Sequence, residues 1–257
     1  MGAAGAGFAT FIANCVSCVY YFVVIYIKRE KTYASISPKD FTLEKKIVVG
    51  VCGVGIPGGI QTLLNVVQMT ILNNFTVGYG TAAMAAMGIA QKIDNVPMNI
   101  AMGGASGIMP LVSYTYASGN YSRMKEAILY FIKIMLICLF ACSALFFIFS
   151  KPLIAIFMND DSVVMYGSSF LRGFCIALPF FCMDYLTVAV FQALGKGRNA
   201  FSFAVARKIV LEIPALYILN HFFHVYGLAY SQFVAELVLS VAGGVLLQRL
   251  FHKLKDC

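Results

Sequence analysis

The sequence predicts an all-α integral membrane protein with about seven transmembrane helices. Of its 257 residues 60% are apolar and only 12% are charged, whereas charged residues make up about 25% of an ordinary soluble domain. The mean hydropathy is +0.82, and residues 1–27 contain no charged side chain. Since similar apolar stretches recur to the end of the chain, most of it is expected to lie in lipid rather than in water.

Seven segments are long and apolar enough to cross a bilayer, because a transmembrane helix needs about 20 apolar residues. They are expected near residues 5–27, 47–71, 84–114, 126–149, 164–192, 200–220 and 226–249. The first span stands apart from the others, because a long polar segment follows it. The chain is therefore expected to have four parts: one helix (1–27), a cytoplasmic linker (28–46), a six-helix bundle (47–250) and a cytoplasmic tail (251–257).

The basic residues between the spans predict how the chain is oriented. Lys and Arg gather in alternate loops, and the opposite set of loops holds only Lys151. Because basic loops resist translocation, the N-terminus is expected outside and the C-terminus in the cytoplasm of a multi-pass plasma-membrane protein. The lipid bilayer thus accounts for the net charge of +8, and no nucleic-acid partner is expected. The basic loop residues are Lys28, Arg29, Lys31, Lys39, Lys45, Lys46, Arg123, Lys125, Lys196, Arg198, Arg249, Lys253 and Lys255.

The second span carries a stripe of uncharged polar side chains. Gln61, Asn65 and Gln68 follow the spacing i, i+4, i+7, which places them on one helix face after a glycine-rich interruption at residues 55–59. Polar groups in lipid are costly unless they are paired. The stripe is therefore expected either to hydrogen-bond a neighbouring helix or to line a cavity beside a flexible kink.

The third span has a methionine-rich face that contains one carboxylate. Because methionine is soft and adapts to different shapes, this face is typical of a promiscuous binding surface, although plain packing also explains the methionines. Gln91, Asp94 and Met98 are its candidate binding residues. The whole face consists of Met84, Met87, Gln91, Asp94, Met98 and Met102, which are three or four residues apart.

Asp184 lies near the middle of the fifth span among aromatic residues, including Phe181 and Tyr185. A charged carboxylate is costly there, so this residue is the strongest candidate to exchange a proton or to hold a cation, with Tyr185 beside it. The structural alternative is an Asp184 that is bonded to a neighbouring hydroxyl group or to Arg172.

The last two spans contain further ionisable residues. Lys208 and Glu212 are four residues apart in the sixth span, so they are expected to pair with each other. Glu236 lies in the seventh span, one turn after Gln232. It is expected either to serve packing or to face the interior as a binding residue.

Patterns typical of enzymes and metal sites are missing from the sequence. His221 and His224 are three residues apart but have no acidic partner nearby, and Cys15 and Cys18 have no second pair at zinc spacing. No nucleophile, base and acid occur in a catalytic arrangement. The chain is therefore expected to be neither an enzyme nor a metal-binding protein, and to need no cofactor.

Several motifs resemble those of the multidrug and toxic compound extrusion (MATE) family. They are residues 103–127 (GGASGIMPLVSYTYASGNYSRMKEA), 191–197 (FQALGKG) and 207–214 (RKIVLEIP). Residues 2–14 (GAAGAGFATFIAN) are similar to the last helix of that family's first half. The resemblance implies a two-lobed fold, in which this chain supplies the last helix of the N-terminal lobe and all six helices of the C-terminal lobe.

The resemblance also implies a function. A member of this family is a secondary active antiporter that exports cationic or aromatic drugs and xenobiotics in exchange for protons or sodium ions. Asp184 matches an acidic position in the fourth helix of the family's second half, whereas Asn65 stands where some sodium-coupled members have Glu. The acidic residue that many members use in the first half lies outside this sequence. The chain is accordingly expected to be truncated, with the missing N-terminal lobe as its partner and small organic cations as its substrates.

Two alternatives stay open beside the antiporter. One is a seven-helix membrane receptor or sensor, although a retinal-type member would need a Lys in the last span and residues 226–248 contain none. The other is a lipid-linked sugar flippase of the same superfamily. The substrate-binding and ion-binding residues expected for the antiporter are Gln61, Asn65, Gln68, Gln91, Asp94, Met98, Asp184, Tyr185 and Glu236.

Overall fold

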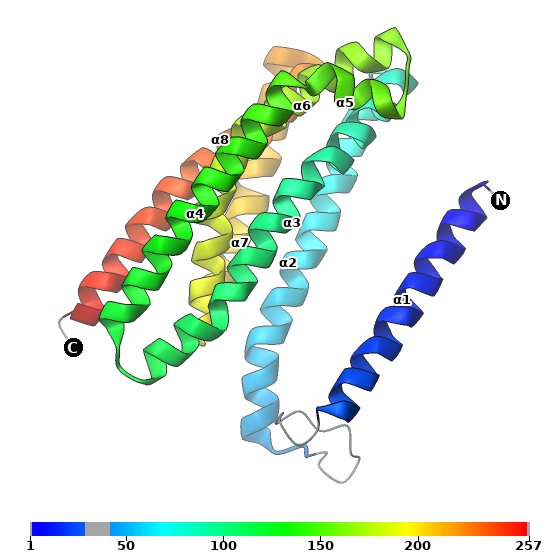
Figure 1. Cartoon of the computed structure of the whole chain (residues 1–257). Helices are drawn as coiled ribbons and strands as arrows, with labels where there is room; N and C mark the ends of the chain where they lie inside the picture. Colours follow the sequence, from blue (N-terminus) through cyan, green and yellow to red (C-terminus); the bar gives the residue numbers. More distant parts are fainter. Residues whose placement is uncertain (1, 29–41, 256–257) are drawn as a thin grey trace. The chain divides into compact units, whose positions relative to one another are not determined.

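The computed structural model describes residues 2–28 and 42–255, which are almost entirely helical (Figure 1). The helices are α1 (Gly2–Ile27), α2 (Lys45–Val77), α3 (Thr81–Ala117), α4 (Tyr121–Ile148), α5 (Ser150–Phe157), α6 (Asp161–Ala193), α7 (Gly197–Val205), the π-helix η2 (Ala206–Glu212) and α8 (Ile213–Lys255). No strand occurs within the two described ranges. The predicted all-α membrane fold is therefore confirmed.

The chain divides into two units, Met1–Gly50 and Val51–Cys257. In the first unit, the side chains of α1 whose burial is described are mostly exposed and apolar, as expected of a helix that faces lipid. Most of the predicted linker, residues 29–41, lies outside the described residues. In the second unit, α8 continues through most of the predicted tail and ends at Lys255.

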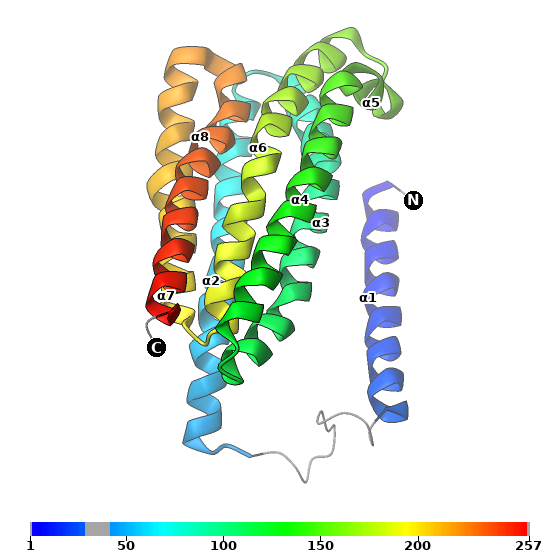
Figure 2. The ribbon, with the colours of Figure 1, turned by 60° about the vertical axis from the view of Figure 1, so that its left-hand side comes forward.

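The helix α6 is central to the second unit, where α3, α4 and α8 pack around it (Figure 2). In its most apolar stretch, 78% of the residues are buried. A helix that is apolar on all sides must be enclosed by other helices. Phe170, Phe174 and Phe181 are at most 2% exposed and form much of this core. The hydrophobic core of the unit therefore follows the length of α6.

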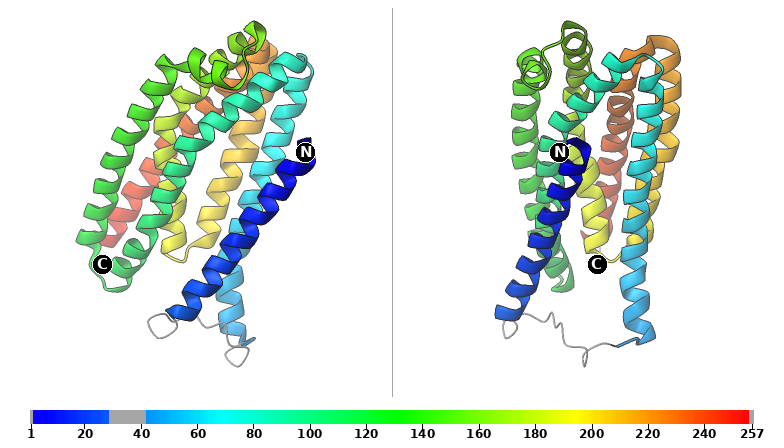
Figure 3. Two further views of the ribbon diagram at one scale, coloured as in Figure 1. Left: turned by 45° about the vertical axis from the view of Figure 1, so that its right-hand side comes forward. Right: turned by 90° about the vertical axis from the view of Figure 1, so that its right-hand side faces the viewer.

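Within the described residues, five helical stretches are both long and apolar enough to cross a membrane, namely Gly7–Ile27, Lys45–Val77, Tyr121–Ile148, Asp161–Ala193 and Gly197–His252. The last of them is 56 residues long and reverses at His224, where φ is 51° and ψ is −139°. Its two arms run in opposite directions (Figures 2 and 3). The helix α3 is less apolar but is 37 residues long. With α3 and the two arms counted, the described residues contain the seven long helical segments that the sequence predicts.

Three local features differ from the sequence-based expectation. The helix α2 continues through residues 55–59, so the predicted interruption there is wrong. A helix broken within lipid would leave backbone groups without hydrogen bonds, which favours a continuous α2. The short helix α5 lies outside the predicted spans, and the π-helix η2 is an unpredicted change of helix type inside the predicted span 200–220.

A short turn connects α3 to α4, and its sequence explains its geometry. Gly119 has a φ of 72°, a left-handed conformation that glycine adopts without steric cost. Asn120 then caps α4, since its side-chain oxygen accepts a hydrogen bond of 3.1 Å from the backbone N–H of Arg123. The Gly-Asn pair in the 103–127 motif is thus a helix stop followed by a helix start.

The close approach of α6 and α8 at Gly173 leads to a test of the packing. A Cβ atom at this position would lie 2.8 Å from the Cβ atom of Ala229, so Gly173→Ala is expected to lower the unfolding free energy by about 1–3 kcal/mol. The measurement is the midpoint of thermal unfolding in detergent, in a background where the other cysteines are replaced, followed with a maleimide dye that reacts with buried Cys175 as it becomes exposed. Gly107→Ala is the control, because a Cβ atom there meets nothing within 4 Å and Ala favours the helix. Equal midpoints for the two variants would contradict the described α6–α8 contact.

Candidate functional site

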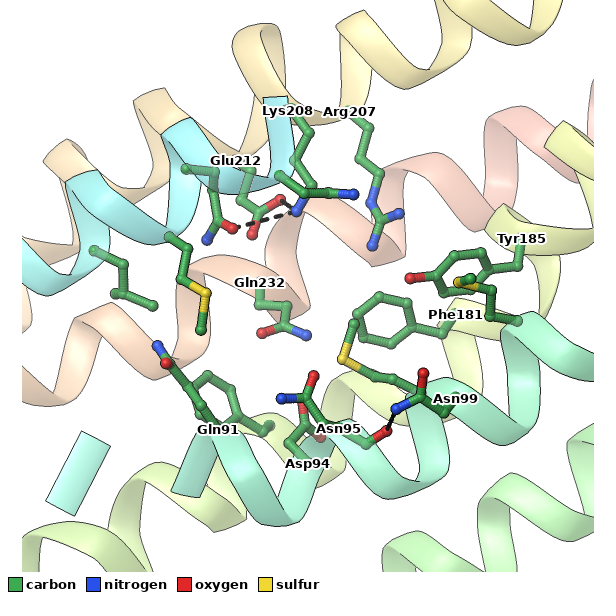
Figure 4. A pocket seen from close by; sticks show the side chains of 17 residues that line it. Gln91, Asp94, Asn95, Asn99, Phe181, Tyr185, Arg207, Lys208, Glu212 and Gln232 are labelled. Carbon is green, nitrogen blue, oxygen red and sulfur yellow. Dashed lines mark hydrogen bonds and ion pairs between the residues drawn. The ribbon is translucent and has the colours of Figure 1, made fainter. Parts of the chain in front are cut away.

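A cavity of about 240 Å³ lies within the second unit, between α2, α3, α6, η2 and α8 (Figure 4). Its walls combine polar, sulfur-containing, aromatic and charged side chains. They are Asn65, Gln68, Met69, Leu72, Gln91, Asp94, Asn95, Met98, Asn99, Met102, Phe174, Phe181, Tyr185, Arg207, Lys208, Glu212 and Gln232. Since such clefts between bundle helices are common ligand sites, this cavity is the candidate functional site.

Carboxamide groups are the main polar component of the cavity. Six of the lining residues are Asn or Gln, and they come from α2, α3 and α8. A carboxamide both donates and accepts hydrogen bonds, so these walls can satisfy polar groups of different kinds on a bound molecule. Met98 and Met102 on α3 and the aromatic rings of α6 supply adaptable apolar surface beside them.

The π-helix η2 brings three charged side chains into the interior. Arg207, Lys208 and Glu212 are only 4%, 7% and 2% exposed. In a π-helix each turn holds more residues than in an α-helix, so consecutive residues lie closer together around the helix axis. Arg207 and Lys208 can therefore both face inward although they are adjacent in the sequence.

Arg207 joins three helical segments through two buried ion pairs. Its Nη1 atom is 2.5 Å from Oδ2 of Asp184 on α6, and its Nη2 atom is 2.6 Å from Oε1 of Glu236 on α8. The guanidinium group also lies over the rings of Phe181 and Tyr185, with 5.0 Å and 5.3 Å to the ring centroids. Asp184, Arg207 and Glu236 form what we call the ionic triad, and each of its two carboxylates is 0% exposed.

Lys208 makes a second, separate ion pair. Its Nζ atom is 2.7 Å from Oε2 of Glu212, which confirms the pairing predicted from their spacing. The same Nζ atom donates a hydrogen bond of 3.4 Å to Oε1 of Gln68, so η2 is also tied to α2. The positive charge of Lys208 is thus shared between a carboxylate and a carboxamide.

Asp94 is in a different situation from the other buried carboxylates. It is 4% exposed and lines the cavity, and no salt bridge reaches it among the described residues. Its Oδ1 atom also has no hydrogen-bond partner within the described part of the chain, while Gln232 lies beside the carboxyl group. In Figure 4, Asp94 lies on the opposite side of the cavity from Arg207 and Lys208. A buried carboxylate without a basic partner is suited to a cationic ligand.

The structure divides the sequence-predicted site residues into two groups. The cavity is lined by Asn65, Gln68, Gln91, Asp94, Met98 and Tyr185. Gln61, Asp184 and Glu236 do not line it. The sequence-based alternative for Asp184, a bond to a hydroxyl group or to Arg172, is not found among the described residues. Asp184 pairs with Arg207 instead, and Arg172 donates its Nε hydrogen to Ser150 Oγ at 3.0 Å.

Sequence reasoning missed several residues of the site. The methionine-rich face splits, since Met87 is buried in the core and Met84 is 47% exposed, while Met98 and Met102 reach the cavity. The α3 residues Asn95 and Asn99 were overlooked, although a polar residue inside an apolar span was signal enough to find them. The inward direction of Arg207 had no such signal, because nothing in the sequence marks the π-helix.

Comparison with known proteins places the chain in a structural and sequence context. Residues 57–218 match the family model of MatE. The chain is 30% identical over 250 residues to the multidrug export protein MepA of Staphylococcus saprophyticus. The aligned region covers 97% of this chain and 54% of the relative. It is 28% identical over 234 residues to MepA of Staphylococcus haemolyticus, covering 91% of this chain and 51% of the relative. The chain thus spans about half the length of these curated relatives.

Solved structures show the same fold. An outward-facing multidrug resistance MATE family transporter of the MOP superfamily has a TM-score of 0.87 at 22% identity, covering 98% of this chain and 57% of the other. The Vibrio cholerae MATE transporter VcmN in its bent form has a TM-score of 0.83 at 18% identity, covering 97% and 56%. At these identities the similarity establishes the arrangement of helices.

The different surroundings of Asp184 and Asp94 predict opposite effects of the same substitution. Asp184→Asn removes one partner of a buried ion pair and is expected to lower the unfolding free energy by about 3 kcal/mol. Asp94→Asn removes an unpaired buried charge, so stability is expected to stay level or rise. Thermal unfolding of both variants in the same detergent is the measurement. Equal losses would show that Asp94 also has a structural ionic partner.

The cavity itself can be tested by thiol labelling. In a background without cysteine, Asn95→Cys and Asn99→Cys are expected to react with a water-soluble thiosulfonate, because the reaction requires a hydrated thiolate. Ile134→Cys is the control, since that side chain is 47% exposed on an apolar face of α4 that lipid would cover. Labelling at the slow rate of the control would mean that water does not reach the cavity.

Proposed function

The chain belongs to the MatE family, and on this basis we propose that it forms part of a secondary active antiporter that exports cationic or aromatic compounds. The coupling ion in this proposal is a proton or a sodium ion, and the location is the plasma membrane. Two relatives named as multidrug export proteins support the proposal, as does the fold shared with MATE transporters.

One observation carries the proposal, namely the charge and chemistry of the cavity in the second unit. Among the described residues, the buried carboxylates in its walls or directly behind Arg207 number four, whereas the buried basic side chains number two. They are Asp94, Asp184, Glu212 and Glu236 against Arg207 and Lys208. An excess of buried negative charge favours a cation, and the aromatic rings and methionines favour a flat or apolar body attached to it.

In the proposed mechanism the cavity is open to one side of the membrane at a time. An organic cation enters from the cytoplasm, contacts the lining side chains, and leaves on the opposite side after the lobes have rearranged. The proposed contacts are Asn65, Gln68, Gln91, Asp94, Met98 and Tyr185. Asp184 and Glu236 are proposed to respond to the coupling ion through Arg207, and Gln61 to extend the polar face of α2 one turn beyond the cavity.

The proposal includes a second lobe as a partner, because alternating access requires two bodies that move against each other. We propose that α1 is the last helix of that other lobe, that residues 28–46 form a cytoplasmic linker and that residues 47–250 form the C-terminal lobe. The distribution of Lys and Arg supports an external N-terminus and a cytoplasmic C-terminus. The lipid bilayer covers the apolar outer surface of these helices.

The two alternative functions have less support. A receptor is not among the relatives described above, and the last helical arm has no Lys for a retinal-type linkage within residues 226–248. A flippase for anionic lipid-linked sugars would favour a cavity with unpaired basic groups. Here both basic side chains of the cavity are paired with carboxylates.

A transport assay tests the proposed function. In proteoliposomes that contain this chain together with an N-terminal lobe, a proton or sodium gradient is expected to drive release of tritiated N-methyl-4-phenylpyridinium. The paired substitution Asn65→Leu and Gln68→Leu removes two hydrogen-bonding groups from the cavity, so the release rate is expected to fall about tenfold or more. An ionophore that collapses the gradient is the control. A release rate that is the same with and without a proton or sodium gradient would contradict an antiporter.

A further inference from the structure

A lysine lies on the exposed apolar face of α4, which lipid is expected to cover. Lys133 is exposed, and it is the only charged residue between positions 127 and 148. One turn before it and one turn after it, Leu129 and Ile137 are 49% and 64% exposed. A charged side chain that faces hydrocarbon is costly unless it reaches an anion or the polar layer of the membrane. The position of Lys133 therefore calls for a negatively charged partner at the lipid surface.

The geometry of α4 directs Lys133 toward one leaflet of the membrane. The helix begins at Tyr121, which lies roughly 18 Å from Lys133 along the axis at about 1.5 Å per residue. Because the Cα–Cβ bonds of a helix tilt toward its N-terminus, the long lysine side chain leans back toward Tyr121. Such a side chain can keep its stem in the acyl region while its ammonium group reaches the headgroups. The phosphate groups of that leaflet are the anions that it meets there.

A groove of about 460 Å³ runs along the same face of α4, from its first turn to Lys133. Its lining combines basic, hydroxyl-bearing and apolar side chains with one carboxylate. The lining residues are Ser122, Lys125, Glu126, Leu129, Tyr130 and Lys133. Their spacing of three or four residues places them on one side of the helix. Lys125 lies beside the end of α8, since its Nζ atom is 5.8 Å from the centre of the Phe251 ring.

The charges of this groove are not paired within the described part of the chain. None of the ion pairs found there includes Lys125, Glu126 or Lys133. Two basic side chains against one carboxylate leave an excess of positive charge in the groove. An anionic occupant is therefore favoured.

The remaining lining residues match the boundary between headgroups and acyl chains. The hydroxyl groups of Ser122 and Tyr130 can donate hydrogen bonds to phosphate oxygens. An exposed tyrosine such as Tyr130, at 68%, is typical of the membrane–water interface. Leu129 offers apolar surface that an acyl chain can cover and a soluble anion cannot. These features together fit a phospholipid.

We propose that this groove binds an anionic phospholipid, with the lipid phosphate against Lys133 and the headgroup extending toward Lys125. The bound lipid neutralises the charge that α4 presents to the hydrocarbon. No residue of α4 lines the cavity between α2, α3, α6, η2 and α8. The proposal thus goes beyond the proposed function and does not depend on which compound is exported.

Quenching of a single tryptophan tests the site. The chain contains no tryptophan, so Leu129→Trp places one fluorescent reporter in the groove. The purified chain is reconstituted in phosphatidylcholine vesicles that contain brominated phosphatidylglycerol or brominated phosphatidylcholine, and the quenching by each lipid gives their relative affinity at the reporter. We expect phosphatidylglycerol to bind at least about fivefold more tightly, which is about 1 kcal/mol.

A second reporter on the same helix is the control for position. Phe140 is 59% exposed but does not line the groove, so Phe140→Trp is expected to show affinities for the two lipids that agree within about twofold. An equal preference for phosphatidylglycerol at both reporters would reflect a general attraction between a basic protein and anionic lipid. That result would overturn the site.

Charge variants in the Leu129→Trp background test the individual residues. Lys133→Gln is expected to lower the preference for phosphatidylglycerol to about twofold or less, whereas Glu126→Gln is expected to raise it because it removes a carboxylate that repels the phosphate. Lys196→Gln is the matched control, since it removes the same charge from the turn between α6 and α7, at the same end of the second unit but outside the groove (Figure 2). It is expected to leave the preference unchanged. All three positions are exposed, so the variants are expected to fold.

A Lys133→Gln protein that keeps the parental preference would overturn the assignment of the phosphate contact. Addition of millimolar inorganic phosphate at constant ionic strength is expected to leave the preference unchanged, and its loss would show that free phosphate rather than lipid fills the groove. If neither brominated lipid quenches the groove reporter, protein such as a second copy of the chain covers this face, and the lipid site is overturned. Each of these outcomes leaves the proposed transport function intact, because the transport assay measures the separate cavity.

Discussion

The buried contacts of Arg207 with Asp184 and Glu236 are the interaction on which the arrangement of the second unit depends. They join η2 to both α6 and the second arm of α8, and all three side chains are at most 4% exposed. Charges enclosed by apolar helices are stable only when they are paired with good geometry. The three segments therefore keep one register relative to each other, and the π-helical turn is what allows Arg207 to reach both carboxylates.

The cavity follows from that constraint. With η2 held against α6 and α8, its basic side chains form one wall, and the polar face of α3 forms the wall opposite. The helix α2 closes the site with Asn65 and Gln68. Of its side chains whose burial is described, only Leu72 and Thr76 are buried, both near its C-terminal end. It is thus the wall with the fewest buried contacts, which is the property expected of an element that moves.

The sequence and the structure differ most over which acidic residue is the leading candidate to bind a cation. Asp184 was the most prominent candidate in the sequence because a carboxylate stands out in the middle of an apolar span. The structure gives it a fixed basic partner, while no described residue forms an ion pair with Asp94 on the methionine-rich face. Sequence alone could not rank the two, because the cost of a buried charge depends on partners that are distant in the chain: Asp184 and Arg207 are brought together only by folding.

The sequence by itself determined the class of fold and the location of most helices. Hydrophobicity and span length are local properties, so the apolar runs, the Gly-Asn turn before α4 and the Lys208–Glu212 pair could all be predicted from neighbouring residues. Only the tertiary structure decided which polar faces meet and which carboxylate lacks a basic partner among the described residues. Those features depend on contacts between residues far apart in the chain and on one π-helical turn, and neither leaves a periodic pattern in the sequence.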